Sequence, residues 1–376
     1  MSRARTYLDW NATAPLRPQA RAAVVAALDI VGNASSPHAE GRRARALIED
    51  ARERVAALVN ARPAEVVFTS GGTEANNAVL AGGWQTILAC GIEHDSVLTP
   101  ARGSGAHLIE VPATRDGVAS RDDLAEHMAR LGKTRTLVSL QMANNETGVL
   151  QPVADVASLA REHGLAVHSD GVQAAGRVAI DMRTLGVDYL TLSAHKLGGP
   201  KGVGALVIRD GASLPAFISG GGQERRRRAG TENVAAIAGF GAAAEVARDD
   251  LADMERVRGL RDGLEAQVRN LTPEAVIVAA EAERLPNTTS LALPGSSAET
   301  LVIALDLRGL AVSAGAACSS GKVGASHVLA AMGLAPDIAR AAIRISLGWS
   351  STKRDVAAFV EAWSDIASGR RERAVA

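Results

Sequence analysis

Short apolar runs alternate with stretches of helical periodicity from about residue 14 to residue 235. Runs such as AEVVFTS, QTILACG and RTLVSLQ read as buried strands, and between them apolar residues recur at helical spacing after polar starts suited to capping. Parallel strands need a crossover connection, which is usually a helix. The alternation therefore predicts an α/β domain with a mainly parallel sheet.

The pattern of predicted helices and strands changes after residue 235. A long Ala- and Arg-rich helical stretch runs to about residue 270, and it is followed by the strand pattern NTTSLAL, a helix in SAETLVIALDLRG and a final helix after SSTKRDV. This order predicts a smaller α+β domain. We expect a large domain of residues 13–250 and a small domain of residues 1–12 and 251–376, because the first dozen residues are too few to fold alone.

Charge and hydropathy exclude several classes of protein. Lys plus Arg equals Asp plus Glu at 41 each, so the chain has no global field that would attract nucleic acid or an anionic membrane. The most apolar long stretch, LVIALDLRGLAVSAGAA, is interrupted by Asp306 and Arg308, which disfavours a membrane span. The first 15 residues lack the apolar core of a signal peptide, so we expect a cytoplasmic protein.

Cysteine usage excludes other kinds of site. With only Cys90 and Cys318, one chain has no disulfide framework, no four-cysteine zinc site and no set of four thiolates for an iron–sulfur cluster. His163 and His168 lie across a helix-to-strand loop without a third ligand, so we predict no metal site. Cys90, within the strand TILACG, is interpreted as core.

Polar residues follow the predicted strands at their carboxyl ends, where an open α/β sheet presents ligand groups. In SGGTE, the backbone N–H groups of Gly72 and Thr73 can bind a phosphate at a helix start, although an ordinary capped helix explains this motif alone. Asp170 follows the strand LAVHS directly. It is either a helix N-cap or a carboxylate that holds a positively charged ring nitrogen.

One strand later, SAHKLGGPKG places Lys196 beside Ser193 and His195, whose side chains can donate to a phosphate. A lysine in this setting is a candidate for imine formation. Phosphate donors, a carboxylate for a ring nitrogen and such a lysine are together what pyridoxal phosphate requires. Three further residues could complete the site: His94 by stacking on the ring, Gln173 at the ring hydroxyl, and Asn145 at the same edge or at the substrate.

At this point the sequence resembles a known family. The motifs that carry the resemblance are YLDWNATAP, NASSPHAEGRRAR, SGGTEANN, EHDSV, NNETGV, SDGVQAAG, LSAHKLGGPKGVGAL, GGGQERRRRAGTEN, SAGAACSSG and IRISLG. They span nearly the whole chain and are similar to those of cysteine desulfurases of the NifS/IscS-like class. This class belongs to the fold-type I, class V aminotransferase group of pyridoxal phosphate enzymes. The resemblance implies a homodimer whose large domain holds a mainly parallel seven-stranded sheet.

The resemblance also implies roles for individual residues. Lys196 would bind the cofactor as an imine, Asp170 would pair with the pyridine nitrogen, and His94 would stack on the ring. The other implied contacts are Gln173 with the phenolic oxygen; Gly72, Thr73, Ser193 and His195 with the phosphate, joined by Thr231 from the partner subunit; and Asn145 and Arg344 with the substrate.

Cys318 decides the reaction that we expect. It lies in AVSAGAACSSGKVGA, a run of small residues that favours a loop, where the family carries its sulfur-accepting nucleophile. The implied reaction converts L-cysteine to L-alanine and leaves a persulfide on Cys318. The sulfur would then pass to an acceptor protein, such as an iron–sulfur scaffold, or to a thiolation pathway.

Alternatives remain open on the sequence alone. A selenocysteine lyase, or another fold-type I lyase or aminotransferase, would use the same cofactor residues. A non-catalytic partner with this fold is disfavoured because Lys196 and Cys318 are both present.

Three places depart from the family pattern. Trp10 stands where Asn is usual, Arg226 where Gly is common, and QMANNE where MHVNNE is more usual. The four arginines 225–228 would on charge alone indicate a solvated basic patch or a nucleic-acid contact, whereas the resemblance puts them near the subunit interface.

Overall fold

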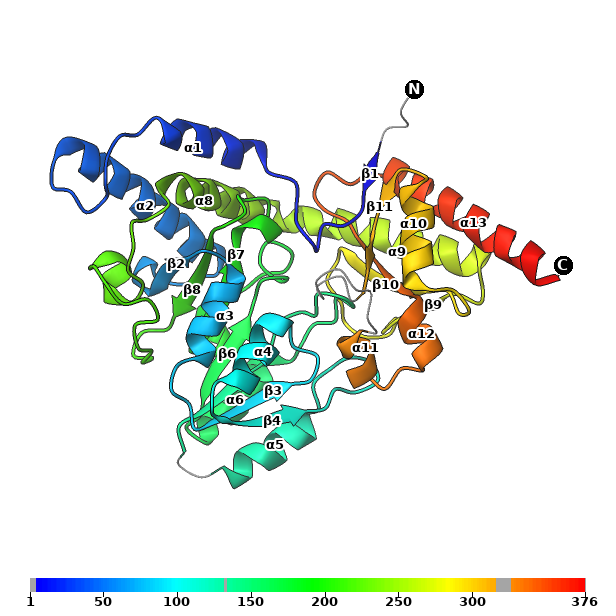
Figure 1. Ribbon diagram of the computed structural model, residues 1–376, viewed down its shortest axis with the longest axis horizontal. Helices are drawn as coiled ribbons and strands as arrows, with labels where there is room; N and C mark the ends of the chain where they lie inside the picture. Colours follow the sequence, from blue (N-terminus) through cyan, green and yellow to red (C-terminus); the bar gives the residue numbers. More distant parts are fainter. Residues whose placement is uncertain (1–4, 132–133, 316–325, 376) are drawn as a thin grey trace.

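The computed structural model describes residues 5–131, 134–315 and 326–375. A large sheet with helices on both faces occupies one side of the molecule, and a second, smaller sheet with its own helices occupies the other (Figure 1). The expected α/β architecture with a mainly parallel central sheet is confirmed.

The large sheet contains seven strands within the described residues, as predicted. In spatial order they are β2 (Val66–Thr69), β8 (Gly204–Ile208), β7 (Tyr189–Ser193), β6 (Ala166–Asp170), β5 (Thr136–Ser139), β3 (Thr86–Cys90) and β4 (His107–Val111). β8 alone among them runs in the direction opposite to the other six. Because β2 runs antiparallel to β8 in turn, the carboxyl ends of β2, β3, β5, β6 and β7 lie at one edge.

Helices bury both faces of this sheet, which explains why its central strands are apolar almost throughout. One face packs against α3 (Gly72–Leu80) and α4 (Asp95–Gly103). The other face packs against α2 (Ala39–Leu58), α5 (Arg121–Arg130), α6 (Val153–Glu162) and α8 (Val234–Asp249). The remaining elements of this part are α1 (Pro18–Leu28), which lies on α8, α7 (Met182–Leu185) and the 3-10 turns η1 (Pro63–Glu65), η2 (Ala194–Lys196) and η3 (Gln223–Arg226).

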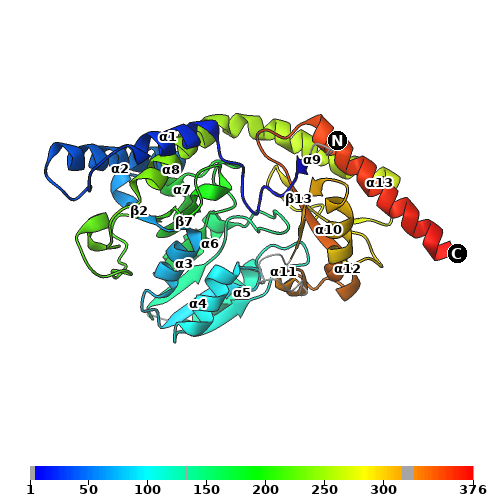
Figure 2. The same cartoon turned by 45° about the horizontal axis from the view of Figure 1, so that its top comes forward.

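The long helical stretch predicted up to residue 270 is two helices rather than one. The 3-10 turn η4 (Asp250–Asp253) separates α8 from α9 (Met254–Leu271). The sequence DDLAD places aspartates at this break, where their side chains compete with the helical backbone for hydrogen bonds. Figure 2 shows α8 and α9 following each other along one side of the molecule toward the second sheet.

The second sheet is antiparallel and has its own apolar cluster, which includes Leu264, Ile343, Phe359 and Trp363. Its strands, in spatial order, are β12 (Ser313–Ala314), β13 (Ala342–Ser346), β10 (Thr288–Ala292) and β9 (Val276–Ile277). The helices of this part are α10 (Ala298–Asp306), α11 (His327–Ala331), α12 (Pro336–Ala341) and α13 (Lys353–Val375). In the ranges described, no helix is long and apolar enough to cross a membrane.

The N-terminal segment joins this second part. β1 (Thr6–Tyr7) pairs in parallel with β11 (Leu310–Ala311), and Leu8 is buried in the second apolar cluster. Trp10 is buried as well, with its ring edge-on to Trp349 at 4.6 Å between centroids and its indole N–H donating to Tyr7 O at 3.1 Å. The predicted domain boundaries at residues 12/13 and 250/251 stay a prediction.

Backbone strain in η3 generates a first testable prediction. Glu224, Arg225 and Arg226 have φ values of 44°, 55° and 64°. Glu224 is held there because its carboxylate accepts from Arg52 Nη1 at 2.8 Å and Arg52 Nη2 at 2.9 Å, and from Phe68 N at 3.0 Å. Arg226 is exposed, and its left-handed backbone costs about 1–2 kcal/mol with no such carboxylate contact to the described residues.

We therefore expect Arg226→Gly to raise the free energy of unfolding by about 0.5–1 kcal/mol, since glycine adopts this conformation freely but loses more entropy on folding. Urea denaturation measures the change. The matched control is Arg227→Gly, because Arg227 has a right-handed φ of −89° and should gain nothing. Equal effects of the two substitutions would contradict the prediction.

A buried histidine generates a second prediction. His168 lies in the middle of β6, fully buried, with Nδ1 2.9 Å from Ser139 Oγ and Nε2 3.0 Å from Thr191 Oγ1. Burial lowers the pKa of His168 to about 4, against a small opposing effect of Asp170. Because the folded pKa is depressed, the stability from neutral His168 is present above about pH 6.5 and is lost as the pH falls toward 4.

Lowering the pH from 7 to 5 should therefore cost the wild-type protein about 2 kcal/mol more than the His168→Gln variant. Urea denaturation at both pH values tests this difference. The exposed His107 provides the control, since His107→Gln should respond to pH as the wild type does. The prediction fails if His168→Gln loses as much stability as the wild type.

Candidate functional site

A cavity of about 410 Å³ lies at the carboxyl edge of the large sheet, where the second sheet and the N-terminal segment meet it. Its lining comes from the ends of β2, β3, β5, β6 and β7 and from residues that follow them, as the strand-end pattern predicted. The lining residues are Asp9, Asn11, Ala12, Gly72, Thr73, Asn76, His94, Ser96, Gln141, Ala143, Asn145, Asp170, Val172, Gln173, Ser193, His195, Lys196, Ser313 and Arg344.

Most of the site residues named from the sequence line this one cavity. They are Gly72, Thr73, His94, Asn145, Asp170, Gln173, Ser193, His195, Lys196 and Arg344. Thr231 is exposed and does not line it. Cys318 lies outside the described residues.

Lys196 ends the short turn η2 that follows β7. Its Nζ donates to Asn11 O at 2.6 Å and to Ala12 O at 3.0 Å, so the amine lies against the backbone of the N-terminal segment. Gln173 Nε2 donates to the same Asn11 carbonyl at 3.1 Å. The lysine and the glutamine are therefore brought together at one oxygen.

The N-terminus of α3 forms one end of the cavity. Gly71 occupies the N-cap position and no side chain caps the helix, which leaves its first N–H groups for another acceptor. Burial, followed by the charges of Lys196 and Lys201, lowers the pKa of the neighbouring His195 to about 4. His195 is therefore neutral near pH 7. Together with the hydroxyls of Thr73 and Ser193, this end suits an anion such as a phosphate.

A chain of hydrogen bonds orients the ring-binding side of the cavity. The Asp170 carboxylate accepts from Asn76 Nδ2 at 2.7 Å and from Val172 N at 2.9 Å. Asn76 Nδ2 also donates to Ser96 Oγ at 2.8 Å, and that hydroxyl lies 2.8 Å from His94 Nδ1. His94 Nδ1 accepts from Ser96 N at 3.1 Å as the N-cap of α4, so the neutral ring carries its proton on Nε2.

Arg344 lies at the opposite side, on β13. It is buried, with Nη1 donating to Asn145 O at 2.9 Å and Nη2 to Asp9 Oδ1 at 2.7 Å. Its Nε, also buried, has no hydrogen-bond partner in the part of the chain that is described. A buried donor of this kind costs free energy until an acceptor arrives, which makes Arg344 suited to a ligand carboxylate.

Several residues of the site were not singled out from the sequence. Asn76 could have been found, because it follows Gly72 by one helical turn and therefore faces the same way. Asp9 and Asn11 carried no local signal, since their place in the cavity depends on how the N-terminal segment crosses between the two sheets. The missed residues are Asp9, Asn11, Asn76, Ser96, Gln141 and Ser313.

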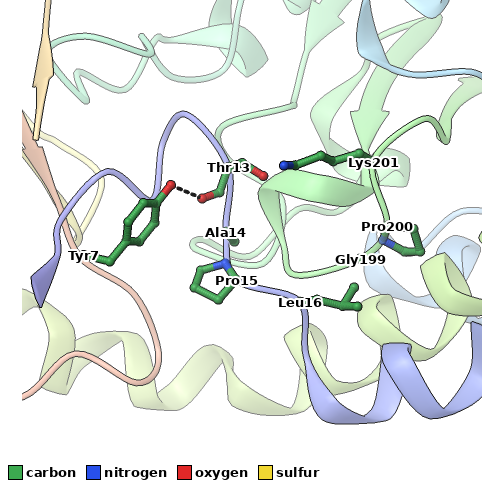
Figure 3. Close-up of a pocket in the computed structure, with 8 residues that line it drawn as sticks. All are labelled: Tyr7, Thr13, Ala14, Pro15, Leu16, Gly199, Pro200 and Lys201. Atoms are coloured by element: carbon green, nitrogen blue, oxygen red, sulfur yellow. Dashed lines mark hydrogen bonds between the residues drawn. The ribbon is translucent and has the colours of Figure 1, made fainter. Parts of the chain in front are cut away.

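A second cavity, of about 560 Å³, lies beyond the N-terminal segment and is mainly apolar (Figure 3). Tyr7, Pro15, Leu16 and Pro200 line it, and the Tyr7 hydroxyl donates to Thr13 O at 2.9 Å. Lys201 lines this cavity and not the one that holds Lys196. This second cavity lacks the polar residues that follow the strands of the large sheet. We therefore place the chemistry in the smaller cavity.

The remaining cysteine and histidines do not form a site of their own. Cys90 is buried in β3, and burial raises its pKa to about 12, so it is an inert thiol near neutral pH. Across the described ranges, no group of three His, Cys, Asp or Glu side chains could hold a metal ion.

The donor set of the first cavity fits pyridoxal phosphate. A helix N-terminus without a side-chain cap, with Thr73, Ser193 and His195 beside it, suits the phosphate. Asp170, oriented by two N–H donors, suits the pyridine nitrogen, and Lys196 supplies an amine for the aldehyde. The buried Arg344 adds a place for the carboxylate of an amino acid.

Comparison with known proteins gives the same result. Residues 6–359 match the family model described as "Aminotransferase class-V". The chain is 39% identical to "Cysteine desulfurase IscS" of Dictyoglomus turgidum, over 93% of this chain and 91% of that protein.

Solved structures are similar over the same length. The NifS-like protein from Rickettsia africae superposes with a TM-score of 0.91 at 35% identity, covering 97% of this chain and 99% of that one. A structure described as SspA in complex with cysteine has a TM-score of 0.79 at 28% identity, covering 91% and 98%. The chain belongs to the NifS/IscS-like cysteine desulfurases, which are pyridoxal-phosphate-dependent enzymes of the class V aminotransferase family.

Proposed function

We propose that this cysteine desulfurase transfers the sulfur of L-cysteine to Cys318 and releases L-alanine, with its cofactor held by Lys196 in the cavity at the sheet edge. The observation that carries the proposal is the meeting of Lys196, Asp170, His94 and Arg344 in that single cavity. The roles of these residues follow from their contacts.

Arg344 binds the carboxylate of L-cysteine in this proposal. Its guanidinium is already oriented by Asp9 and by the Asn145 carbonyl, and its unpartnered Nε offers a donor to the incoming acid. The side-chain amide of Asn145, which lines the same cavity, is placed to contact either the substrate or the cofactor edge. This arrangement holds the amino group of the substrate toward Lys196.

Lys196 moves the proton at the substrate Cα. Bound pyridoxal phosphate supplies an electron sink that weakens the bonds at that carbon. The backbone carbonyls of Asn11 and Ala12 hold the amine of Lys196 at the cavity wall, within reach of a substrate fixed by Arg344. Asp170 would pair its negative charge with the ring nitrogen of the cofactor, and His94, at the start of α4, would cover the ring.

Cys318 accepts the sulfur. Described residues on both sides of its segment support this role. Ser313 lines the cavity, and a Cβ on Gly315 would lie 2.9 Å from Glu146 Oε2. Ser326 Oγ donates to the same carboxylate oxygen at 2.6 Å, and Glu146 is adjacent to Asn145.

The sulfur transfer needs no further oxidant or reductant. The Cys318 thiolate attacks the substrate sulfur; the new S–S bond forms as the Cβ–S bond breaks, and the electron pair of that bond passes to the substrate carbon. Protonation of that carbon gives L-alanine and leaves the persulfide on the enzyme. We further propose that the persulfide is delivered to an acceptor protein in iron–sulfur assembly or thiolation, in the cytoplasm.

We also propose that the enzyme acts as a homodimer. Leu16, Val25, Leu28 and Val31 lie on or next to α1, with exposed fractions of 45%, 56%, 70% and 83%. Arg228 pairs with Glu74 of α3 at 2.9 Å, so the segment before Thr231 packs beside the phosphate end of the site. We propose that a partner subunit covers these apolar residues and that its Thr231 joins the phosphate contacts.

Replacement of Cys318 tests the sulfur transfer. Cys318→Ala should reduce the formation of alanine and sulfide from L-cysteine by about 100-fold or more, because Cys90, the other cysteine, is buried, while the absorption of the bound cofactor stays unchanged. Cys90→Ala is the matched control and should retain turnover. Turnover by Cys318→Ala close to that of the wild type would refute the role.

Charges placed on α1 test the dimer. The double variant Val25→Glu, Leu28→Glu should shift the sedimentation coefficient to that of a monomer and weaken cofactor binding, because two carboxylates would be buried at the interface. Leu307, 82% exposed on the other side of the chain after α10, provides the control. Leu307→Glu should leave the dimer intact. A wild-type monomer at micromolar concentration would contradict the proposal.

A further inference from the structure

Arg177 is a buried cation without a carboxylate partner. It lies in the turn after β6, and only 7% of the residue is exposed. Its guanidinium donates to Gln173 O at 2.9 Å, to Gln173 Oε1, to Trp10 O at 3.4 Å and to Lys196 O at 3.4 Å. All of these acceptors are neutral, and the described residues place no carboxylate within ion-pair distance of it.

An unpaired buried charge is costly, by several kcal/mol in typical proteins. Consistent with that cost, burial lowers the pKa of Arg177 to about 9, and the charge of Arg344 acts in the same direction. Even so, Arg177 is protonated near neutral pH. A cation retained under this penalty, directly behind the cavity, indicates a role toward the groups that face the cavity.

The contacts of Arg177 connect it to two such groups. Because Gln173 Oε1 accepts from Arg177, the Gln173 amide is turned with its Nε2 toward Asn11 O and the cavity. The same Asn11 carbonyl accepts from Lys196 Nζ, and Arg177 also holds the carbonyl of Lys196. A donor from a cation polarises the amide that accepts it, so the N–H groups of Gln173 become stronger donors to a ligand.

Two carboxylates near Lys196 already have a cation as partner. Asp9 pairs with Arg344, and Arg17, which donates to Leu197 O, pairs with Asp250. The titratable and charged groups that surround Lys196 are His195 and Lys201 on its own segment, Arg177 and Asp170 at the end of β6, His94 at the start of α4, Asp9 and Arg344 beside the second sheet, and Arg17 with Asp250.

We propose that Arg177 is a positioning residue of the desulfurase site: it fixes the Gln173 amide with its N–H groups toward the cofactor, and its charge disfavours protonation of the Lys196 nitrogen. This inference rests on the assignment of Lys196 and Gln173 in the proposed function. A nitrogen kept unprotonated is the form that can add to a carbonyl or accept a proton. The buried charge thus favours the reactive form of Lys196.

The test is a pH titration of the absorption of bound pyridoxal phosphate in the purified holoenzyme. In Arg177→Met, which keeps an unbranched but shorter side chain and loses the charge, the midpoint for protonation of the nitrogen that joins Lys196 to the cofactor should rise by about one pH unit. In Arg177→Lys the midpoint should stay near that of the wild type, since the charge remains. Cofactor affinity should fall about tenfold in both variants, because Nη1 of Arg177 no longer holds the Gln173 amide.

Arg261→Met controls for a general loss of stability. Arg261 is a buried arginine that donates to Leu285 O at 3.1 Å and does not line the cavity, so its loss should leave the midpoint unchanged. If Arg177→Met does not fold, Arg177→Gln provides a neutral side chain that keeps N–H donors, and it should show the same rise. A midpoint within about 0.2 pH units of the wild type in the neutral variant overturns the inference.

The Lys196→Ala variant distinguishes failure of this inference from failure of the proposed function. If the wild-type absorption band persists in Lys196→Ala, the assignment of Lys196 is wrong. If the band is lost in Lys196→Ala and the neutral variant at position 177 titrates as the wild type does, only the role of Arg177 is wrong.

Discussion

The common direction of β2, β3, β5, β6 and β7 is the constraint on which the site depends. Each strand delivers its following residues to the same edge of the sheet, so groups far apart in the chain meet within one cavity. Helices on both faces keep the strands buried, and this packing leaves the edge as the place where polar side chains converge. The phosphate end, the ring contacts and Lys196 all follow from this arrangement.

The cavity is completed by a second constraint, the N-terminal segment that crosses between the two sheets. Asn11 N donates to Ser346 Oγ and Asn11 Nδ2 to Thr288 Oγ1, both at 2.9 Å, while the Asn11 carbonyl accepts from Lys196 and Gln173. One residue thus connects the second sheet to the chemical groups of the first. Such a buried polar network holds its members only when all of them are present. Docking of the two parts and assembly of the site are therefore coupled.

Local patterns in the sequence were sufficient for much of this architecture. Strand and helix positions in the large sheet follow from apolar runs and capping signals, and the motifs around Thr73, Asp170 and Lys196 predicted both the cavity edge and the cofactor. The break at η4 was missed, because helical periodicity continues across it while the aspartates alter only the hydrogen bonding. Asn11, Asp9 and Arg177 contact partners distant in sequence, which no periodicity encodes.

The amino-acid sequence by itself determined the set of chemical groups available and the order in which strands present them, because β-strand and helix signals depend on neighbouring residues. The tertiary structure decided which of those groups touch. It brought Asn11 to Lys196, Asn76 to Asp170 and Arg177 to the carbonyls of Trp10 and Lys196, since these hydrogen bonds require the packing of whole layers and not the preference of any short segment. Only that packing places the charge of Arg177 behind Lys196.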